Sequence, residues 1–286
     1  MFANYWEPQN LWEAISLLSR QNGAVPMAGG TDLLVKIKKG QIKAPELVNL
    51  KRLVELKELA FNGQTLNIGA LTRVSALLEN SEVNRHFPVL ALAARGLGTP
   101  QIRNTATIGG NLCNSSPAAD LSVALLAYEA RLKTIGPDGA RLVPVHEFFS
   151  APGRNVLKPG EVLVGVEIDV PPLHSGGTFI KHGRRKSHEI ALVNIAVMLA
   201  WEPGKKKISA ARIALGAVAP IPMRVRDAED FLVNAQPGEN GWKEAGSLVM
   251  KAISPIDDVR SSAAYRRQIA GVLTRRALAE AWGESL

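Results

Sequence analysis

The stretch Thr107-Ile-Gly-Gly-Asn-Leu-Cys-Asn-Ser-Ser-Pro-Ala-Ala-Asp120 is short, polar and rich in groups that can face a ligand. Gly109 and Gly110 carry no side chain, so the backbone there can come close to a bulky partner. The apolar segment 121–128 that follows is typical of a helix. A glycine-bearing turn before a helix directs backbone N–H groups at whatever lies in front of it, which suits a phosphate. Taken alone, the stretch is equally compatible with an ordinary loop that ends in a helix cap.

A second stretch of the same kind is Ala28-Gly-Gly-Thr-Asp32, which lies between the apolar run 24–27 and the helical pattern 33–39. It has neither the Gly-x-Gly-x-x-Gly spacing of a Rossmann nucleotide site nor the Gly-Lys-Ser/Thr end of a Walker loop. Taken alone, it is better explained as a turn capped by Thr31 or Asp32. Two such turns in one chain, each following an apolar segment, favour a ligand bound between them.

Length and composition indicate a globular protein of two domains. The chain has 286 residues, of which 46% are hydrophobic and 21% charged. The apolar runs are too short and interrupted to span a membrane. The first eight residues have neither the basic nor the apolar region of a secretory signal, so a cytoplasmic location is expected.

The single cysteine, Cys113, excludes an internal disulfide and a cysteine-ligated iron–sulfur cluster within this chain. The five histidines show no metal-binding spacing, so no metal site is expected. The net charge of +8 raises the possibility of nucleic-acid binding, but the dense basic cluster 181–188 has no interleaved aromatic residues for base stacking. An anionic cofactor or an acidic partner subunit fits the charge as well.

Hydrophobic periodicity predicts a mixed α and β chain with a helical C-terminus. Asn62-Gly63 predicts a hairpin turn, and the Pro- and Gly-rich segment 171–177 predicts the domain boundary. The expected helices span 10–21, 33–39, 74–78, 88–95, 121–128, 228–234, 242–252 and 265–282. The expected strands span 24–27, 46–50, 58–61, 66–71, 131–135, 141–144, 162–170, 178–181, 192–201 and 208–218.

Five motifs, in this order and spacing, resemble the FAD-binding (medium) subunits of molybdenum hydroxylases, the family of carbon monoxide dehydrogenase and xanthine dehydrogenase. The resemblance covers essentially the full length of the chain. The motifs are Ala28-Gly-Gly-Thr-Asp-Leu33, Ile68-Gly-Ala-Leu71, Pro100-Gln-Ile-Arg-Asn104, Thr107-Ile-Gly-Gly-Asn111 and Ser116-Pro-Ala-Ala-Asp120.

The resemblance implies an α+β fold with a vanillyl-alcohol-oxidase-type (PCMH-like) FAD-binding domain over residues 1–175. That domain would consist of two α/β subdomains, at about 1–55 and 56–175, and a sheet-and-helix C-terminal domain would cover 176–286. It also implies assembly with a small subunit carrying two [2Fe–2S] clusters and a large subunit carrying molybdopterin, as a dimer of heterotrimers. The single cysteine agrees with this division, because the clusters then lie in another chain.

The resemblance also implies which residues bind FAD. The backbone of Ala28, Gly29, Gly30, Thr31 and Asp32 would cradle the diphosphate. A second wall would come from Ala106, Thr107, Gly109, Gly110 and Asn111. Polar contacts would come from Ser116 and Asp120, and apolar surface from Leu33, Leu97 and Leu163. Lys181 would lie near the flavin ring, where a cation stabilises the reduced state, unless it is an ordinary solvated lysine; Ile190 stands where some members carry an aromatic residue.

The function that follows is that of an electron-transfer flavoprotein subunit. Substrate is hydroxylated at molybdenum in a partner chain, and electrons pass through the partner's clusters to FAD and on to an external acceptor. No residue of this chain is expected to act as a general acid or base. Two alternatives stay open: a self-sufficient FAD oxidase, although neither glycine motif contains a histidine, and a non-enzymatic nucleotide-binding module, suggested by the pI of 9.7.

Overall fold

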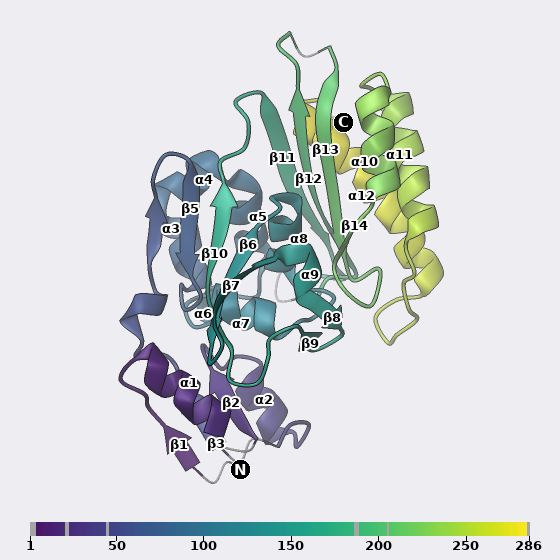
Figure 1. Cartoon of the computed structure of the whole chain (residues 1–286). Helices are drawn as coiled ribbons and strands as arrows, with labels where there is room; N and C mark the ends of the chain where they lie inside the picture. Colours follow the sequence, from purple (N-terminus) through teal and green to yellow (C-terminus); the bar gives the residue numbers. More distant parts are fainter. Residues whose placement is uncertain (1–3, 21–22, 44–45, 186–188, 205, 285–286) are drawn as a thin grey trace.

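The computed structural model of the chain describes residues 4–20, 23–43, 46–185, 189–204 and 206–284 (Figure 1). Three expectations fall partly outside these residues. They are the basic cluster 181–188 at 186–188, the end of the first expected helix at Gln21, and the N-terminal segment at 1–3.

The N-terminal part forms a small α/β unit, drawn at the bottom of Figure 1. Its three strands are parallel and lie in the order β1-β3-β2, so each connection must cross over through a helix. Helix α1 buries Ala14 and Ile15 from its apolar stripe against this unit, as the sequence pattern predicts. The elements are β1 (Asn4–Trp6), α1 (Leu11–Arg20), β2 (Ala24–Met27), α2 (Leu33–Lys38) and β3 (Glu46–Asn49).

The central part is built on a five-stranded antiparallel sheet in the order β4-β5-β10-β6-β7. Its helices pack on this sheet around the largest hydrophobic core of the chain. The strands are β4 (Leu59–Phe61), β5 (Thr65–Gly69), β6 (Arg131–Gly136), β7 (Gly139–Pro144) and β10 (Val162–Asp169), with a separate pair β8 (Phe149–Ala151) and β9 (Arg154–Asn155). The helices are η1 (Val54–Leu56), α3 (Val74–Glu79), α4 (Ser81–His86), α5 (Pro88–Gly96), α6 (Pro100–Arg103), α7 (Ile108–Cys113), α8 (Asp120–Ala127) and α9 (Val145–Phe148).

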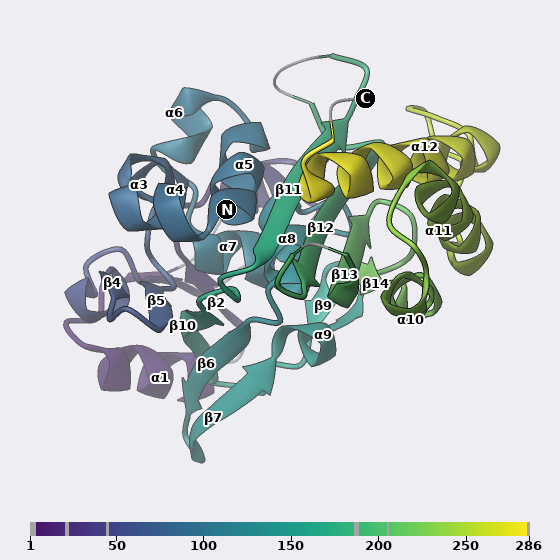
Figure 2. The same ribbon diagram turned by 90° about the horizontal axis from the view of Figure 1, so that it is seen from above.

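The C-terminal part is a four-stranded antiparallel sheet in the order β11-β12-β13-β14, covered by three helices. Figure 2 shows the sheet between these helices on one side and α5 and α8 on the other. Because both faces are covered, β12 is buried along most of its length, and every residue of α8 is buried. The elements are β11 (Ser175–His182), β12 (Val193–Trp201), β13 (Ile208–Gly216), β14 (Met223–Arg224), α10 (Arg226–Asn234), α11 (Glu239–Ala252) and α12 (Ala263–Trp282).

The glycines of the predicted interdomain break lie inside strand β11. A Cβ atom on Gly176 would stand 2.3 Å from the carbonyl oxygen of Ala281 in α12. A Cβ atom on Gly177 would stand 2.4 Å from the sulfur of Met198 on β12. These glycines therefore permit close packing of the strand. In the sequence alone, glycines with this role look the same as the glycines of a flexible linker.

Four short α-helices of the central part, α4, α6, α7 and α9, and the 3-10 helix η1 are absent from the expected elements. Two consecutive glycines in α7 disfavour a helix by propensity alone. The helix forms because the Thr107 side chain caps the N–H of Gly110 at 3.0 Å, and because Ile108 and Leu112 are fully buried. In α6 the hydroxyl of Thr99 caps the N–H of Ile102 at 3.3 Å.

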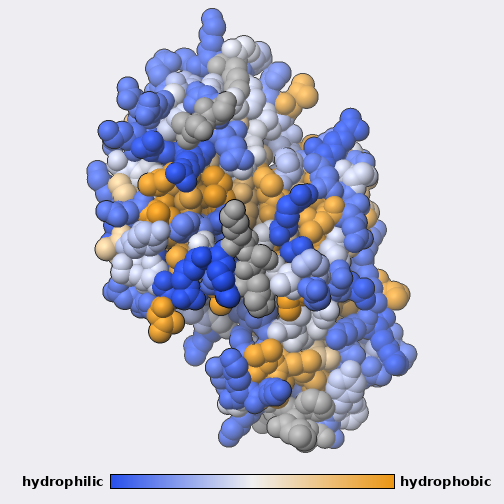
Figure 3. Space-filling view, turned by 180° about the vertical axis from the view of Figure 1, so that it is seen from behind, coloured by the Kyte–Doolittle hydropathy of each residue, from blue (hydrophilic) through white to orange (hydrophobic). Residues whose placement is uncertain are grey.

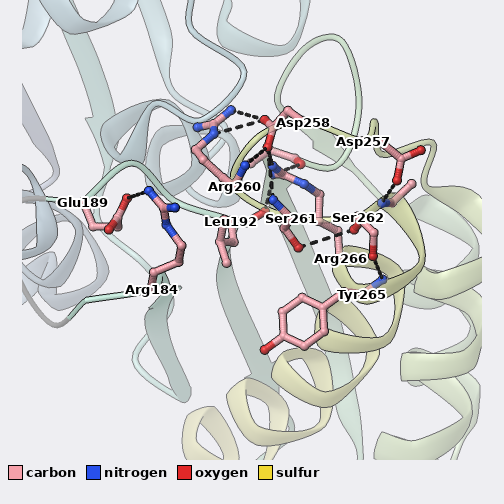
Figure 4. A network of polar contacts seen from close by, with 12 residues as sticks. Arg184, Glu189, Leu192, Asp257, Asp258, Arg260, Ser261, Ser262, Tyr265 and Arg266 are labelled. Atoms are coloured by element: carbon pink, nitrogen blue, oxygen red, sulfur yellow. Dashed lines mark hydrogen bonds and ion pairs between the residues drawn. The ribbon is translucent and has the colours of Figure 1, made fainter.

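A buried charge network joins the last helix to the four-stranded sheet (Figure 4). The guanidinium of Arg266, only 2% exposed, donates to the carbonyl oxygen of Leu192 at 2.8 Å and to Asp258 at 2.9 Å. Burial opposes ionisation of Asp258, yet hydrogen bonds from Arg260 and the charge of Arg266 hold its pKa well below its usual range. The network fixes the start of α12 against the sheet.

A second charged contact lies at the edge of the five-stranded sheet. Glu161 accepts hydrogen bonds from Arg141 Nε at 2.5 Å, from Thr134 Oγ1 at 2.5 Å and from the N–H of Lys158 at 2.8 Å. Burial opposes its ionisation, but these hydrogen bonds outweigh burial and lower its pKa from 4.5 to about 2.

We predict that Glu161→Gln lowers the free energy of unfolding at pH 7 by up to about 3 kcal/mol. The folded pKa is depressed, so this stability is complete above pH 4.5 and is lost as the pH falls toward 2. Urea unfolding of wild type and variant at several pH values checks this, and the difference should shrink in acid. Asp138→Asn, at a carboxylate whose side chain is 83% exposed, is the control. A difference for Glu161→Gln that does not change with pH would contradict the prediction.

Candidate functional site

A cavity of about 770 Å³ lies between the N-terminal unit and the central part. It is lined by both glycine stretches, by Leu97 at the end of α5, and by the segment 157–163 that leads into β10. The volume is in the range of small-molecule and cofactor sites.

The two glycine stretches are in direct contact at this cavity. Gly29 is buried, and a Cβ atom there would stand 2.2 Å from the carbonyl oxygen of Thr105, just before the second stretch. A Cβ atom on Gly110 would lie 3.0 Å from the Thr107 hydroxyl, its nearest neighbour, and 3.8 Å from the Cβ atom of Ala28. Gly29 is therefore required for the approach of the two loops, whereas Gly110 faces the cavity.

The first stretch presents free backbone donors. Within the part of the chain that the structure describes, the N–H groups of residues 29–32 have no protein acceptor. Gly30 has a φ of +81°, a left-handed conformation that glycine adopts without strain. Successive N–H groups in such a turn form an anion-binding concavity. The loop thus has the local geometry to accept a phosphate group.

The second stretch does not present free backbone donors, which corrects the expectation that its turn would. The N–H of Gly109 donates to Ala70 at 2.9 Å, that of Gly110 to the Thr107 hydroxyl at 3.0 Å, and that of Asn111 to the Thr107 carbonyl at 3.0 Å. This wall instead offers the Thr107 hydroxyl and the Asn111 side chain. Among the described residues, Asn111 Oδ1 is a buried oxygen without a hydrogen-bond partner.

Most of the predicted cofactor residues line the cavity. They are Ala28, Gly29, Gly30, Thr31, Asp32, Leu33, Leu97, Ala106, Thr107, Gly109, Gly110, Asn111 and Leu163. Leu97 and Leu163 are largely buried and supply apolar wall. Ile190 is 57% exposed and does not line the cavity.

Ser116, Asp120 and Lys181 do not line the cavity. Asp120, the first residue of α8, accepts hydrogen bonds from Lys181 Nζ and Asn194 Nδ2, both at 2.7 Å. Lys181 also donates to the carbonyl oxygen of Gly96 at 3.0 Å, next to Leu97 in the cavity wall. Burial raises the pKa of Asp120, and Lys181 and Asn194 offset part of that rise. The Asp120–Lys181 pair therefore connects β11 to the cavity wall at Gly96 and Leu97 without itself lining the cavity. The Ser116 hydroxyl accepts a bond from the N–H of Ala118 in the turn before α8.

Several lining residues are missing from the predicted set, among them Lys36, Asn114 and Lys158. Lys36 stands one helical turn after Asp32, and that spacing is the only sequence signal that could place it beside the loop. Its Nζ donates to Asn114 Oδ1 at 2.5 Å, which joins α2, the helix after the first glycine stretch, to the C-terminal end of α7 in the second stretch. Lys158 comes from a distant segment, and no local pattern predicts its position.

The fold is that of a flavoprotein subunit with an FAD-binding domain and a C-terminal domain. Residues 1–171 match the model of the FAD binding domain in molybdopterin dehydrogenase, and residues 178–281 match that of the CO dehydrogenase flavoprotein C-terminal domain. The chain belongs to this family of molybdopterin dehydrogenase flavoprotein subunits.

Similar proteins match along their whole length. The xanthine dehydrogenase FAD-binding subunit of Escherichia coli O157:H7 is 33% identical over 283 residues, 98% of this chain and 96% of the relative. The carbon monoxide dehydrogenase medium chain of Hydrogenophaga pseudoflava is 32% identical over 280 residues, 97% and 96% of the two chains.

Solved structures agree with these matches. Carbon monoxide dehydrogenase from Hydrogenophaga pseudoflava superposes with a TM-score of 0.95 at 31% identity, over 99% of this chain and 98% of the other. Quinoline 2-oxidoreductase from Pseudomonas putida 86 superposes with a TM-score of 0.92 at 29% identity, over 99% and 97%. The predicted family and fold class are confirmed, and the flavoprotein-subunit function is favoured over a self-sufficient oxidase or a nucleotide-binding module.

We predict different effects for two glycine substitutions. Gly110→Val places its methyl groups in the cavity, so the chain stays folded but FAD affinity falls roughly tenfold or more. Gly29→Ala drives a Cβ atom into the Thr105 carbonyl and destabilises the fold by about 3 kcal/mol. Thermal unfolding of the FAD-free chain and FAD titration separate the two effects. Full FAD occupancy in the Gly110→Val variant would refute the position assigned to Gly110.

We also predict strong coupling between Asp120 and Lys181. Asp120→Leu leaves a buried cation unpaired and costs about 3–5 kcal/mol of unfolding free energy, and adding Lys181→Met restores part of it. Urea unfolding of the two single variants and the double variant measures the coupling. The more exposed pair Lys133–Glu167 is the control, with coupling of about 1 kcal/mol or less. Additive effects of the Asp120 and Lys181 substitutions would rule out the coupling.

Proposed function

We propose that this chain holds FAD in the cavity between its first two parts, as the electron-transfer subunit of a molybdenum hydroxylase complex. The observation that carries the proposal is the loop 29–32, whose free N–H groups line a cavity of about 770 Å³. The loop has the donor chemistry for a diphosphate, and the adjoining apolar walls suit aromatic rings. The similarity to FAD-binding subunits supports the same assignment.

The residues would divide the binding work by chemistry. The N–H groups of residues 29–32 would hold the diphosphate, with Ala28 beside them. The Thr107 hydroxyl and the unpartnered Asn111 oxygen would make the polar contacts of the opposite wall. Leu33, Leu97, Ala106 and Leu163 would pack against the rings.

Bound FAD supplies the redox chemistry, which no side chain of the cavity provides. Two lining residues that could serve as a base, Cys113 and Glu161, are not free to do so. Burial raises the pKa of Cys113 to about 12, so it stays a neutral thiol, and Glu161 is held by Arg141. The protein's contribution is therefore to orient the cofactor and shield it from water. The Asp120–Lys181 pair lies outside the cavity lining and would set the charge distribution on the C-terminal side of the site. Ser116 would stabilise the turn that leads to Asp120.

We further propose a small partner with two [2Fe–2S] clusters and a large partner with molybdopterin, assembled as a dimer of heterotrimers in the cytoplasm. The chain's single cysteine supports placing the clusters elsewhere. Apolar surface is exposed, as Figure 3 shows across the middle and over the lower part of one face. In the N-terminal unit Trp12, Leu34 and Val35 are 64%, 42% and 49% exposed, which suits burial against a partner. No helix among the described residues is long and apolar enough to cross a bilayer.

We propose an FAD-binding domain over residues 1–175 and a C-terminal domain over residues 176–286. The FAD-binding domain would divide into subdomains at about 1–55 and 56–175. The separate three-, five- and four-stranded sheets support this division. Strand β11 begins at Ser175, next to the proposed limit.

We predict that the purified chain, reconstituted with FAD, shows stoichiometric flavin absorbance in the visible range. Without partners it should not be reduced by a substrate of the complex, because the hydroxylation chemistry belongs to another chain. Absorbance spectra before and after substrate addition test both statements. A folded chain that takes up no FAD would contradict the proposal. Direct reduction of the flavin by substrate would favour a self-sufficient oxidase. Steeply salt-dependent DNA binding would favour the nucleotide-binding module.

A further inference from the structure

The side chain of Lys36 links the helix after the first glycine stretch to the second glycine stretch. It projects from α2, which follows the first stretch, and its Nζ donates to Asn114 Oδ1 at 2.5 Å. Asn114 is the residue at which α7, the helix of the second stretch, ends. Both residues line the cavity. The hydrogen bond between them therefore links two parts of the wall of the cavity in which the diphosphate is proposed to lie.

The charge on Lys36 is not balanced by a carboxylate in the described structure. Four charged residues line the cavity: Asp32, Lys36, Lys158 and Glu161. Glu161 is paired with Arg141, and Lys158 lies 3.6 Å from Asp138 with its side chain 60% exposed. Asp32, the N-cap residue of α2 one turn before Lys36, makes no ion pair with it among the described residues. The partner of Lys36 is a neutral amide, so an anion in the cavity would improve its environment.

We infer that Lys36 is the counter-cation of the cofactor's diphosphate, and that it makes the site select diphosphate-bearing dinucleotides over the bare flavin. This inference rests on the proposed FAD site. The backbone donors of the loop 29–32 are neutral and its one charged side chain is the Asp32 carboxylate, so this loop does not balance the two negative charges of the diphosphate. A lysine ammonium is a compact charge on a flexible stem, so it can exchange the Asn114 oxygen for a phosphoryl oxygen by a small rotation. Asn114 then serves to hold Lys36 in place before the ligand enters.

The experiment compares Lys36→Met with Lys36→Arg and with the matched control Lys38→Met. Lys38 is on the same helix, is exposed and does not line the cavity. The probes are FAD, ADP, riboflavin and adenosine, titrated into the cofactor-free chain by calorimetry. ADP carries the diphosphate without the flavin, and riboflavin and adenosine carry a ring without the diphosphate. Thermal unfolding of each cofactor-free variant confirms that it is folded.

We expect Lys36→Met to weaken FAD and ADP binding by about 10- to 100-fold and to leave riboflavin and adenosine unchanged, since only the first two carry the charge. Lys36→Arg should retain most of the affinity, and Lys38→Met all of it. Added salt should weaken FAD binding less in Lys36→Met than in wild type.

Equal FAD affinity in wild type and Lys36→Met would overturn the inference while leaving the proposed function intact. Equal losses for all four probes would also overturn it, because they would show a packing role in place of a charge. A wild-type chain that binds no FAD would remove the proposed function and this inference together, so the two failures are distinguishable.

Discussion

The contact between two side-chain-poor loops is the constraint on which the site depends. Gly29 stands so close to the carbonyl oxygen of Thr105 that no side chain fits between them. This approach brings the parallel N-terminal unit against the antiparallel central part and leaves the cavity beside the contact. A larger residue at Gly29 would have to separate the units, and the walls of the cavity would separate with them.

The two loops differ in chemistry although their sequences look alike. The first keeps its N–H groups free, and Gly30 takes a left-handed conformation that turns them toward one region. The second uses its N–H groups internally, because Thr107 caps α7 and Gly109 is bonded to the end of β5. One loop therefore offers free backbone donors, and the other is a wall held by its own hydrogen bonds. Such a wall opposite a donor loop is an arrangement that can hold a ligand in one orientation.

The C-terminal part supports the cavity wall through contacts of Lys181, which does not itself line the cavity. Lys181 on β11 reaches Asp120 and the carbonyl oxygen of Gly96, so the four-stranded sheet is connected to the residue preceding Leu97. The close packing of Gly176 against α12 holds the strand that carries Lys181. Burial of this charge pair makes the relative position of sheet and cavity wall energetically important, because separating the pair would leave a buried charge unpaired.

The sequence by itself determined the type of most elements, because periodicity and turn residues act locally. Its motifs also identified, through the family resemblance, 13 of the residues that line the cavity. Only the tertiary structure decided that α7 is a helix despite its two glycines, since a cap and two buried side chains stabilise it. It also decided that Gly176 and Gly177 belong to a strand, that Asp120 faces Lys181, and that Lys36 meets Asn114. These last contacts join residues far apart in the chain, and no local pattern encodes which distant atoms will be neighbours.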